Sequence, residues 1–85
     1  MNVQNTRPFD RDYARLPEEV KGQVDKQLAL LLANPRHPSL GCKRIRGTEG
    51  IWEVRVSRSH RLTLEIAGET YILRRVGAHD VLHQP

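Results

Sequence analysis

The apolar residues of this chain change their period once, from the spacing of a helix to the alternation of a strand. Before residue 35 they recur every three or four positions, as in Val20, Val24, Leu28, Leu31 and Leu32. From residue 51 onward apolar and polar residues alternate, first over 51–57 and then over 61–66. Helices followed by an antiparallel meander make one α+β domain, and 85 residues leave room for a single domain, 1–85.

Prolines mark where the predicted helices begin and end. A short first helix presents Phe9, Tyr13 and Leu16 on one face, and Thr6 is its expected cap. A second helix opens at Pro17 and ends before Pro35, because the residue before a proline is pushed out of the helical region. After a leading strand at 43–46, strands are expected at 51–57, 61–66 and 70–76, while 77–85 is too short for a large element. We therefore predict two N-terminal helices packed on a twisted antiparallel sheet of about four strands, to which residues 1–5 could add an edge strand.

Several classes of protein are excluded or disfavoured by the composition. No apolar run approaches the roughly 18–20 residues of a membrane span, and residues 1–7 lack the apolar stretch of a secretory signal. The single cysteine, Cys42, permits neither an internal disulfide nor a cysteine-based zinc site. No pair of the four histidines has the i, i+4 spacing of a zinc site within a predicted helix, and no glycine-rich loop precedes a helix. We expect a reduced, cytoplasmic protein without a metal or other cofactor.

Positive charge concentrates in the second half of the chain. Residues 41–85 carry eight Lys/Arg against five Asp/Glu, and seven of the eight are arginine. Because Val54 and Leu62 must share the core face, strand register puts Arg55 and Arg61 together on the opposite face. With Val54 opposite Leu62, Arg55 lies opposite Arg61; a shift by two residues instead places Ser57 there.

A third arginine is expected on the same outer face, because a two-residue turn after Ala67 would pair Thr63 with Arg74. Such a face is either a solvated surface, neutralised by Glu53 and Glu65, or a surface that binds an anion. The positive charge is compatible with a nucleic acid or with an acidic protein segment as partner, because arginine forks fit phosphate and carboxylate alike.

His79 follows the last predicted strand, next to these arginines. A histidine beside several arginines, with no metal and no covalent nucleophile, fits the cleavage of RNA, whose own 2′-hydroxyl attacks the phosphate. The enzyme then needs only a group that transfers protons and cations that stabilise the developing charge. The ordinary pKa of histidine lies near 6.5, which suits the first role.

Motifs along nearly the whole chain resemble small toxins of the RelE/ParE superfamily. The resemblance rests on Phe9…Tyr13…Leu16-Pro17, Asn34-Pro35…His37-Pro38-Ser39-Leu40, Lys43…Ile45…Gly47, Ile51-Trp52-Glu53-Val54-Arg55-Val56, His60-Arg61-Leu62 and Arg74-Arg75-Val76-Gly77-Ala78-His79-Asp80. It implies the RelE-like fold and a type II toxin–antitoxin system, in which an antitoxin with an acidic or disordered segment neutralises the toxin. RelE-like members are ribosome-dependent endoribonucleases that cut mRNA in the A site without a metal.

The resemblance also implies roles for individual residues. Arg61 matches the arginine that stabilises the scissile phosphate, with Arg55 and Arg74 assisting, and His79 matches the catalytic histidine of the YafQ-like branch. In this hypothesis His79 is the general acid or base and Asp80 orients it. The remaining expected contacts to RNA phosphates are Lys43, Arg46 and Arg58.

The chain departs from the family pattern at three positions, which leaves other functions open. Glu53 stands where some members carry a catalytic lysine, Asp80 follows the histidine where several use a nearby tyrosine, and His83 replaces a closing aromatic residue. One alternative is a ParE-like protein that inhibits DNA gyrase by binding alone. The other is a decayed toxin that only binds its antitoxin. The sequence identifies neither the antitoxin nor any codon preference.

Overall fold

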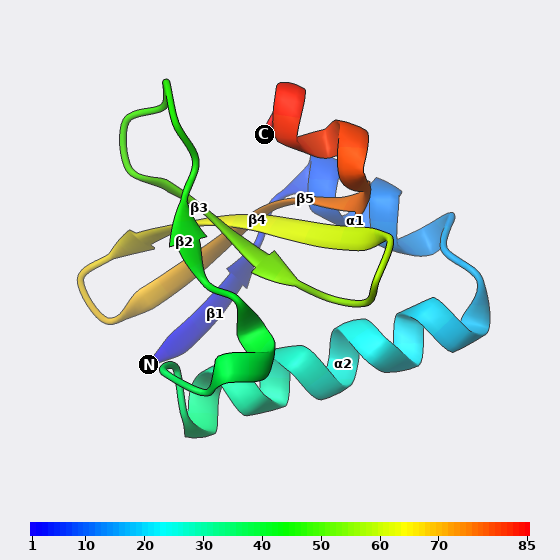
Figure 1. Ribbon diagram of the computed structural model, residues 1–85, viewed down its shortest axis with the longest axis horizontal. Coiled ribbons are helices and arrows are strands. Elements are labelled where there is room, and N and C mark those ends of the chain that lie inside the picture. The colour runs from blue at the N-terminus through cyan, green and yellow to red at the C-terminus, as the bar shows by residue number, and fades with distance from the viewer.

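The computed structural model describes all 85 residues, in a single five-stranded mixed sheet with two helices (Figure 1). The strands are β1 (Asn2–Asn5), β2 (Lys43–Arg44), β3 (Ile51–Arg55), β4 (His60–Ala67) and β5 (Thr70–Ala78), in the sheet order β1-β5-β4-β3-β2. The α+β class is confirmed, but the predicted sheet of about four antiparallel strands is wrong. The possible N-terminal edge strand does form, as β1. It runs parallel to β5 and hydrogen-bonds to the backbone groups along the edge of β5.

The helices are α1 (Arg7–Ala14) and α2 (Glu18–Ala33). Thr6 caps α1 as predicted: its hydroxyl accepts a bond from the Phe9 amide at 3.3 Å and donates to the Leu73 carbonyl of β5 at 2.8 Å. Two short 3₁₀ helices, η1 (Pro38–Leu40) and η2 (His79–His83), complete the chain. The tail that was expected to be too short for a large element therefore forms one short turn. None of these helices is long and apolar enough to cross a membrane.

The core lies between α2 and the face of the sheet that α2 crosses (Figure 1). Its fully buried members come from both layers and from η1: Val24 and Leu31 of α2, Leu40 of η1, and Val54, Leu62, Leu64, Leu73 and Val76 of the sheet. α1 adds Phe9 at one side, where it packs along β5 beyond the end of β1. The apolar faces of the helices and strands thus form one core cluster. Functional side chains of the sheet must therefore lie on its opposite face or at its margins.

The register of β3 on β4 follows the first of the two predicted alternatives. Val54 pairs with Leu62, and Arg55 lies directly opposite Arg61. Between β4 and β5, however, the register shifts at Thr63, which pairs with Arg75 instead of the predicted Arg74. The extra residue is a β-bulge, and it allows two consecutive arginines to reach the same C-terminal segment.

The outer face of the sheet is covered at its centre, where it is therefore neither of the two predicted alternatives, a solvated surface or a surface that binds an anion. Thr63 is completely buried and donates to the carbonyl of Pro85 at 3.1 Å. η2 lies on β4 and β5, and a Cβ added at Gly77 would sit 2.9 Å from a methyl carbon of Val81. The C-terminal segment therefore leaves accessible only the margins of the arginine-bearing face.

Candidate anion-binding site

A hollow of about 520 Å³ lies between α2 and the β3–β4 turn. Its lining residues are Gln23, Lys26, Gln27, Ser39, Arg55, Val56, Ser57, Arg58 and Arg61. The hollow brings together three of the predicted cations and adds a fourth, Lys26, which the sequence analysis missed. No carboxylate lines it, and none of its four cations has a carboxylate oxygen within 4.0 Å. We call this set of residues the α2 hollow; its uncompensated positive charge suits it to an anion.

Arg61 is held by the turn beside it. Its Nη1 donates to the carbonyls of Ser57, at 2.8 Å, and His60, at 2.9 Å. These two hydrogen bonds fix the guanidinium against the β3–β4 turn. Nε and Nη2 have no acceptor within the protein. A planar guanidinium fixed at one nitrogen, with the other two nitrogens free to donate, is well suited to bind two oxygens of a phosphate.

Arg55 lies beside Gly41, the residue that ends η1. A Cβ at Gly41 would be 3.8 Å from both Cβ and Nε of Arg55, and Gly41 has a φ of 51°. This left-handed conformation favours glycine, so the arginine stem lies against nearly bare backbone. Arg55 itself remains exposed, and its position opposite Arg61 brings the two cations together on adjacent strands.

Gln27 joins the three segments that form the α2 hollow. Its side chain is buried, and its amide nitrogen donates to the carbonyl of Arg55 at 2.9 Å and to that of Ser39 at 3.3 Å. Gln27 continues the apolar stripe of α2, because it stands three residues after Val24 and four before Leu31. A polar residue on an apolar stripe is the signal that could have identified it from the sequence.

His79 and Asp80 lie outside the α2 hollow, exposed in the first turn of η2. His79 comes directly after Ala78, which pairs with His60, so it belongs to the same end of the sheet as the β3–β4 turn. Asp80 does not hydrogen-bond to the imidazole. The histidine next to Arg61 is His60, whose Nδ1 is 3.2 Å from the hydroxyl oxygen of Ser57.

The other three predicted phosphate contacts lie elsewhere. Lys43 Nζ is 3.8 Å from a carboxylate oxygen of Glu53, Arg46 is exposed in the β2–β3 connection, and Arg74 is on the far side of the sheet's covered centre. Arg74 was expected beside Arg55 and Arg61, but the bulge turns it toward the C-terminal segment instead. No group of three or more His, Cys, Asp or Glu side chains is placed to hold a metal ion.

Solved structures of bacterial and archaeal toxins share this architecture. YafQ from E. coli strain BL21(DE3) matches with a TM-score of 0.80 and 14% identity, over 95% of this chain and 96% of YafQ. The RelB–RelE antitoxin–toxin complex from Methanococcus jannaschii contains a match with a TM-score of 0.77 and 19% identity, over 96% of both chains. A YoeB/ParE toxin from Agrobacterium tumefaciens matches with a TM-score of 0.77 and 16% identity, over 93% of this chain and 99% of that toxin.

Sequence comparison alone finds no such relatives. No family model matches the chain, and no curated protein does. At identities of 14–19%, the likeness lies in the arrangement of helices and strands along nearly the whole length of each chain. The chain therefore adopts the RelE-like fold, the fold that YafQ, RelE and YoeB/ParE toxins share.

Proposed function

We propose that this chain is the toxin of a type II toxin–antitoxin system and inhibits translation by cutting mRNA on the ribosome, without a metal. The observation that carries the proposal is the α2 hollow, in which three further uncompensated cations lie around the partly fixed guanidinium of Arg61. The fold, shared with several toxins, supports the same conclusion. A cytoplasmic location follows from the proposed substrate.

The proposed reaction is transfer of the phosphate within the RNA chain. The 2′-oxygen attacks the adjacent phosphorus, the bond from phosphorus to the 5′-oxygen breaks, and a cyclic phosphate remains. A base takes the proton of the 2′-hydroxyl, and an acid gives one to the leaving 5′-oxygen. Charge builds on the non-bridging oxygens, where the free Nε and Nη2 of Arg61 donate and the Arg55 cation adds its attraction.

His79 is the proposed general acid or base. It is exposed and makes no hydrogen bond within the protein, so its ring is free to meet RNA bound across the end of the sheet. Asp80, the next residue, orients the ring when RNA is bound. Arg58, Lys43 and Arg46 contact phosphates of the message or of ribosomal RNA on either side of the cut.

The proposed protein partner is an antitoxin with an acidic, disordered segment. The fold neighbours include RelB–RelE and DinJ–YafQ complexes, in which a toxin of this fold is bound to its antitoxin. A segment rich in carboxylates would neutralise the cations of the α2 hollow and exclude RNA from it.

The test is to induce the chain in cells without an antitoxin and to follow protein and DNA synthesis separately by pulse labelling. We expect protein synthesis to fall first, with cuts that map to messages on ribosomes. Arg61→Ala and His79→Ala should each abolish growth arrest, because loss of one charge-stabilising donor costs about 10²–10³ in rate and loss of a proton-transfer group about 10²–10⁴. Arg36→Ala removes an exposed cation outside the α2 hollow and should remain toxic.

Each contrary result has its own meaning. If DNA synthesis falls first, a ParE-like inhibitor of gyrase is the better account. If the wild-type chain folds and binds an antitoxin without arresting growth, it is a decayed toxin. If both alanine variants remain fully toxic, the roles given to Arg61 and His79 are wrong.

A further inference from the structure

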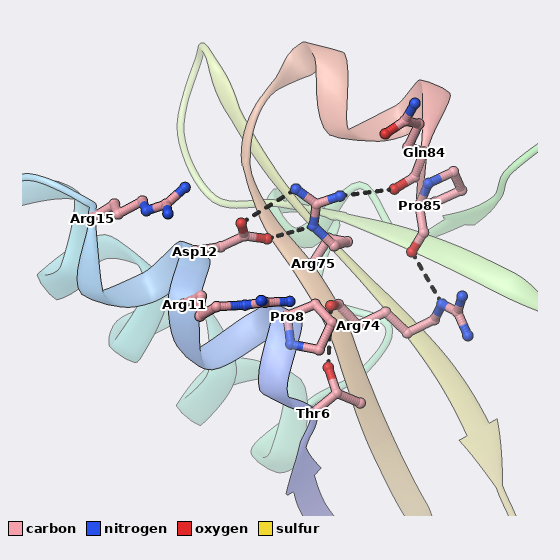
Figure 2. A pocket seen from close by; sticks show the side chains of 9 residues that line it. All are labelled: Thr6, Pro8, Arg11, Asp12, Arg15, Arg74, Arg75, Gln84 and Pro85. Atoms are coloured by element: carbon pink, nitrogen blue, oxygen red, sulfur yellow. Dashed lines mark hydrogen bonds and ion pairs between the residues drawn. The ribbon is translucent and has the colours of Figure 1, made fainter.

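A second hollow, of about 570 Å³, lies between α1, β5 and the C-terminal segment (Figure 2). Its lining residues are Thr6, Pro8, Arg11, Asp12, Arg15, Arg74, Arg75, Gln84 and Pro85. It shares no residue with the α2 hollow. We call it the α1 hollow; four of its nine residues are arginines, and the function proposed above uses none of them.

The positive charge of the α1 hollow is only partly compensated. Arg75 makes a two-point ion pair with Asp12, with N–O distances of 2.6 and 3.2 Å, and Arg74 Nη1 is 2.8 Å from Glu65. The hydrogen bond and charge of Asp12 raise the pKa of Arg75, so this guanidinium stays charged. Arg11 and Arg15 have no carboxylate oxygen within 4.0 Å and no hydrogen bond.

The two unpaired arginines are separated by about one helical turn along the chain. Arg11 lies on α1, and Arg15, four residues later, is the residue that ends this helix, a spacing at which like charges on a helix repel by some tenths of a kcal/mol. Both side chains extend from α1 toward β5 and its two arginines (Figure 2). On the opposite wall, the bulge in β5 holds Arg74 and Arg75 together, and both donate to carbonyls of the C-terminal segment. The fold thus concentrates cations around a space that nothing in the protein fills.

The lining favours a phosphate backbone over a peptide. Apart from two prolines, it offers no apolar side chain, whereas peptide segments that bind tightly depend on buried apolar or aromatic anchors. Backbone phosphates of nucleic acids need only cations and hydrogen-bond donors. We propose that the α1 hollow is a second RNA-binding site, which holds backbone phosphates outside the segment that is cut. This inference rests on the proposed function, in which the protein binds RNA.

The experiment measures RNA binding as a function of salt. The probe is a fluorescent single-stranded 12-mer with 2′-O-methyl riboses, which lacks the attacking hydroxyl and so stays intact. Fluorescence anisotropy is recorded across a salt series for wild type, Arg11→Gln/Arg15→Gln and Arg55→Gln/Arg61→Gln. A matched control, Arg7→Gln/Arg36→Gln, removes two exposed cations that line neither the α1 nor the α2 hollow.

We expect Arg11→Gln/Arg15→Gln to bind more weakly and with a shallower dependence on salt. Each phosphate contact to a single strand contributes about 0.7 to the slope of log K against log salt, so loss of two contacts should reduce it by about 1.4. Both positions are exposed, and glutamine is a good helix former, so the variant should fold. The matched control should retain the wild-type slope.

Three results would overturn the inference. A wild-type slope for Arg11→Gln/Arg15→Gln, with weakened binding by Arg55→Gln/Arg61→Gln, refutes the α1 hollow but leaves the proposed function standing. Wild-type RNA binding by both variants refutes both proposals. The third result uses a 12-residue polyglutamate probe: if Arg11→Gln/Arg15→Gln loses the peptide but retains RNA, the hollow binds an acidic protein segment instead.

Discussion

Replacing Gly77 by alanine tests how tightly η2 is seated on the sheet. The new Cβ would lie 2.9 Å from Cγ1 of Val81, well inside the optimum of about 3.5–4.0 Å for two carbon atoms. Val81 is buried, so its methyl group cannot simply turn into solvent. Either η2 moves away from β5, or the side chain of Val81 leaves its preferred rotamer.

The size of the effect follows from two opposing contributions. Overpacking of this kind costs about 1–3 kcal/mol. Gly77 does not have a positive φ, so alanine is unstrained there and gains about 0.4–1 kcal/mol by restricting the unfolded chain. We expect Gly77→Ala to lower the free energy of unfolding by about 1.3 kcal/mol, the difference between the midpoints of these two ranges. In a Val81→Ala background the obstructing methyl is gone, and the same change should stabilise by about 0.4–1 kcal/mol.

Urea denaturation of the wild type, the two single variants and the double variant measures this reversal of sign. Thermal unfolding should agree, with about 4–8 °C of Tm for each kcal/mol in a domain of this size. If Gly77→Ala destabilises equally in both backgrounds, contact between η2 and β5 is not the cause, and the close seating of η2 described above is refuted.

Two further variants test the α2 hollow and the core. Gln27→Leu should lower the free energy of unfolding by about 1–3 kcal/mol, because the carbonyls of Ser39 and Arg55 lose their donor. Thermal unfolding measures the loss, and Gln23→Leu, in the same hollow but without such hydrogen bonds, is the control. Equal losses of stability in the two variants would contradict the role of Gln27. Burial raises the pKa of the Cys42 thiol, so the unfolded chain loses this proton first and stability should fall as pH rises above the ordinary thiol pKa of about 8.5. Urea titrations at pH 8 and 9.5 should show that Cys42→Ala reduces this fall, and an unchanged fall would disprove the assignment.

The local pattern of apolar residues predicted the elements and one strand register. The alternation around Val54 and Leu62 left only two registers, and one of them is observed. The bulge was also encoded, because the buried positions of the last strand are Tyr71, Leu73 and Val76, so the period of two breaks after Leu73. For β1 the sequence indicated only a possible edge strand at 1–5: its mostly polar residues carry no alternation, and its parallel pairing with β5 depends on tertiary packing.

The candidate site was predictable where it depends on strand register and not where it depends on packing between distant segments. Arg55 and Arg61 meet because they are opposite each other on adjacent strands. Lys26 joins them only because α2 crosses the sheet near the β3–β4 turn, which no local pattern specifies. The placement of Arg74 failed because a single inserted residue changes which neighbours a strand residue meets.

The pairing of the first strand with the last has a consequence for synthesis of the chain. Asn2 pairs with Thr70 and Asn5 with Leu73, so β1 leaves the ribosome long before its partner is made. β5 is also the strand that joins β1 to the rest of the sheet. A nascent chain that stops before Thr70 has neither the connecting strand nor the anchor for α1, so the domain can complete its sheet only after nearly all of it has been translated.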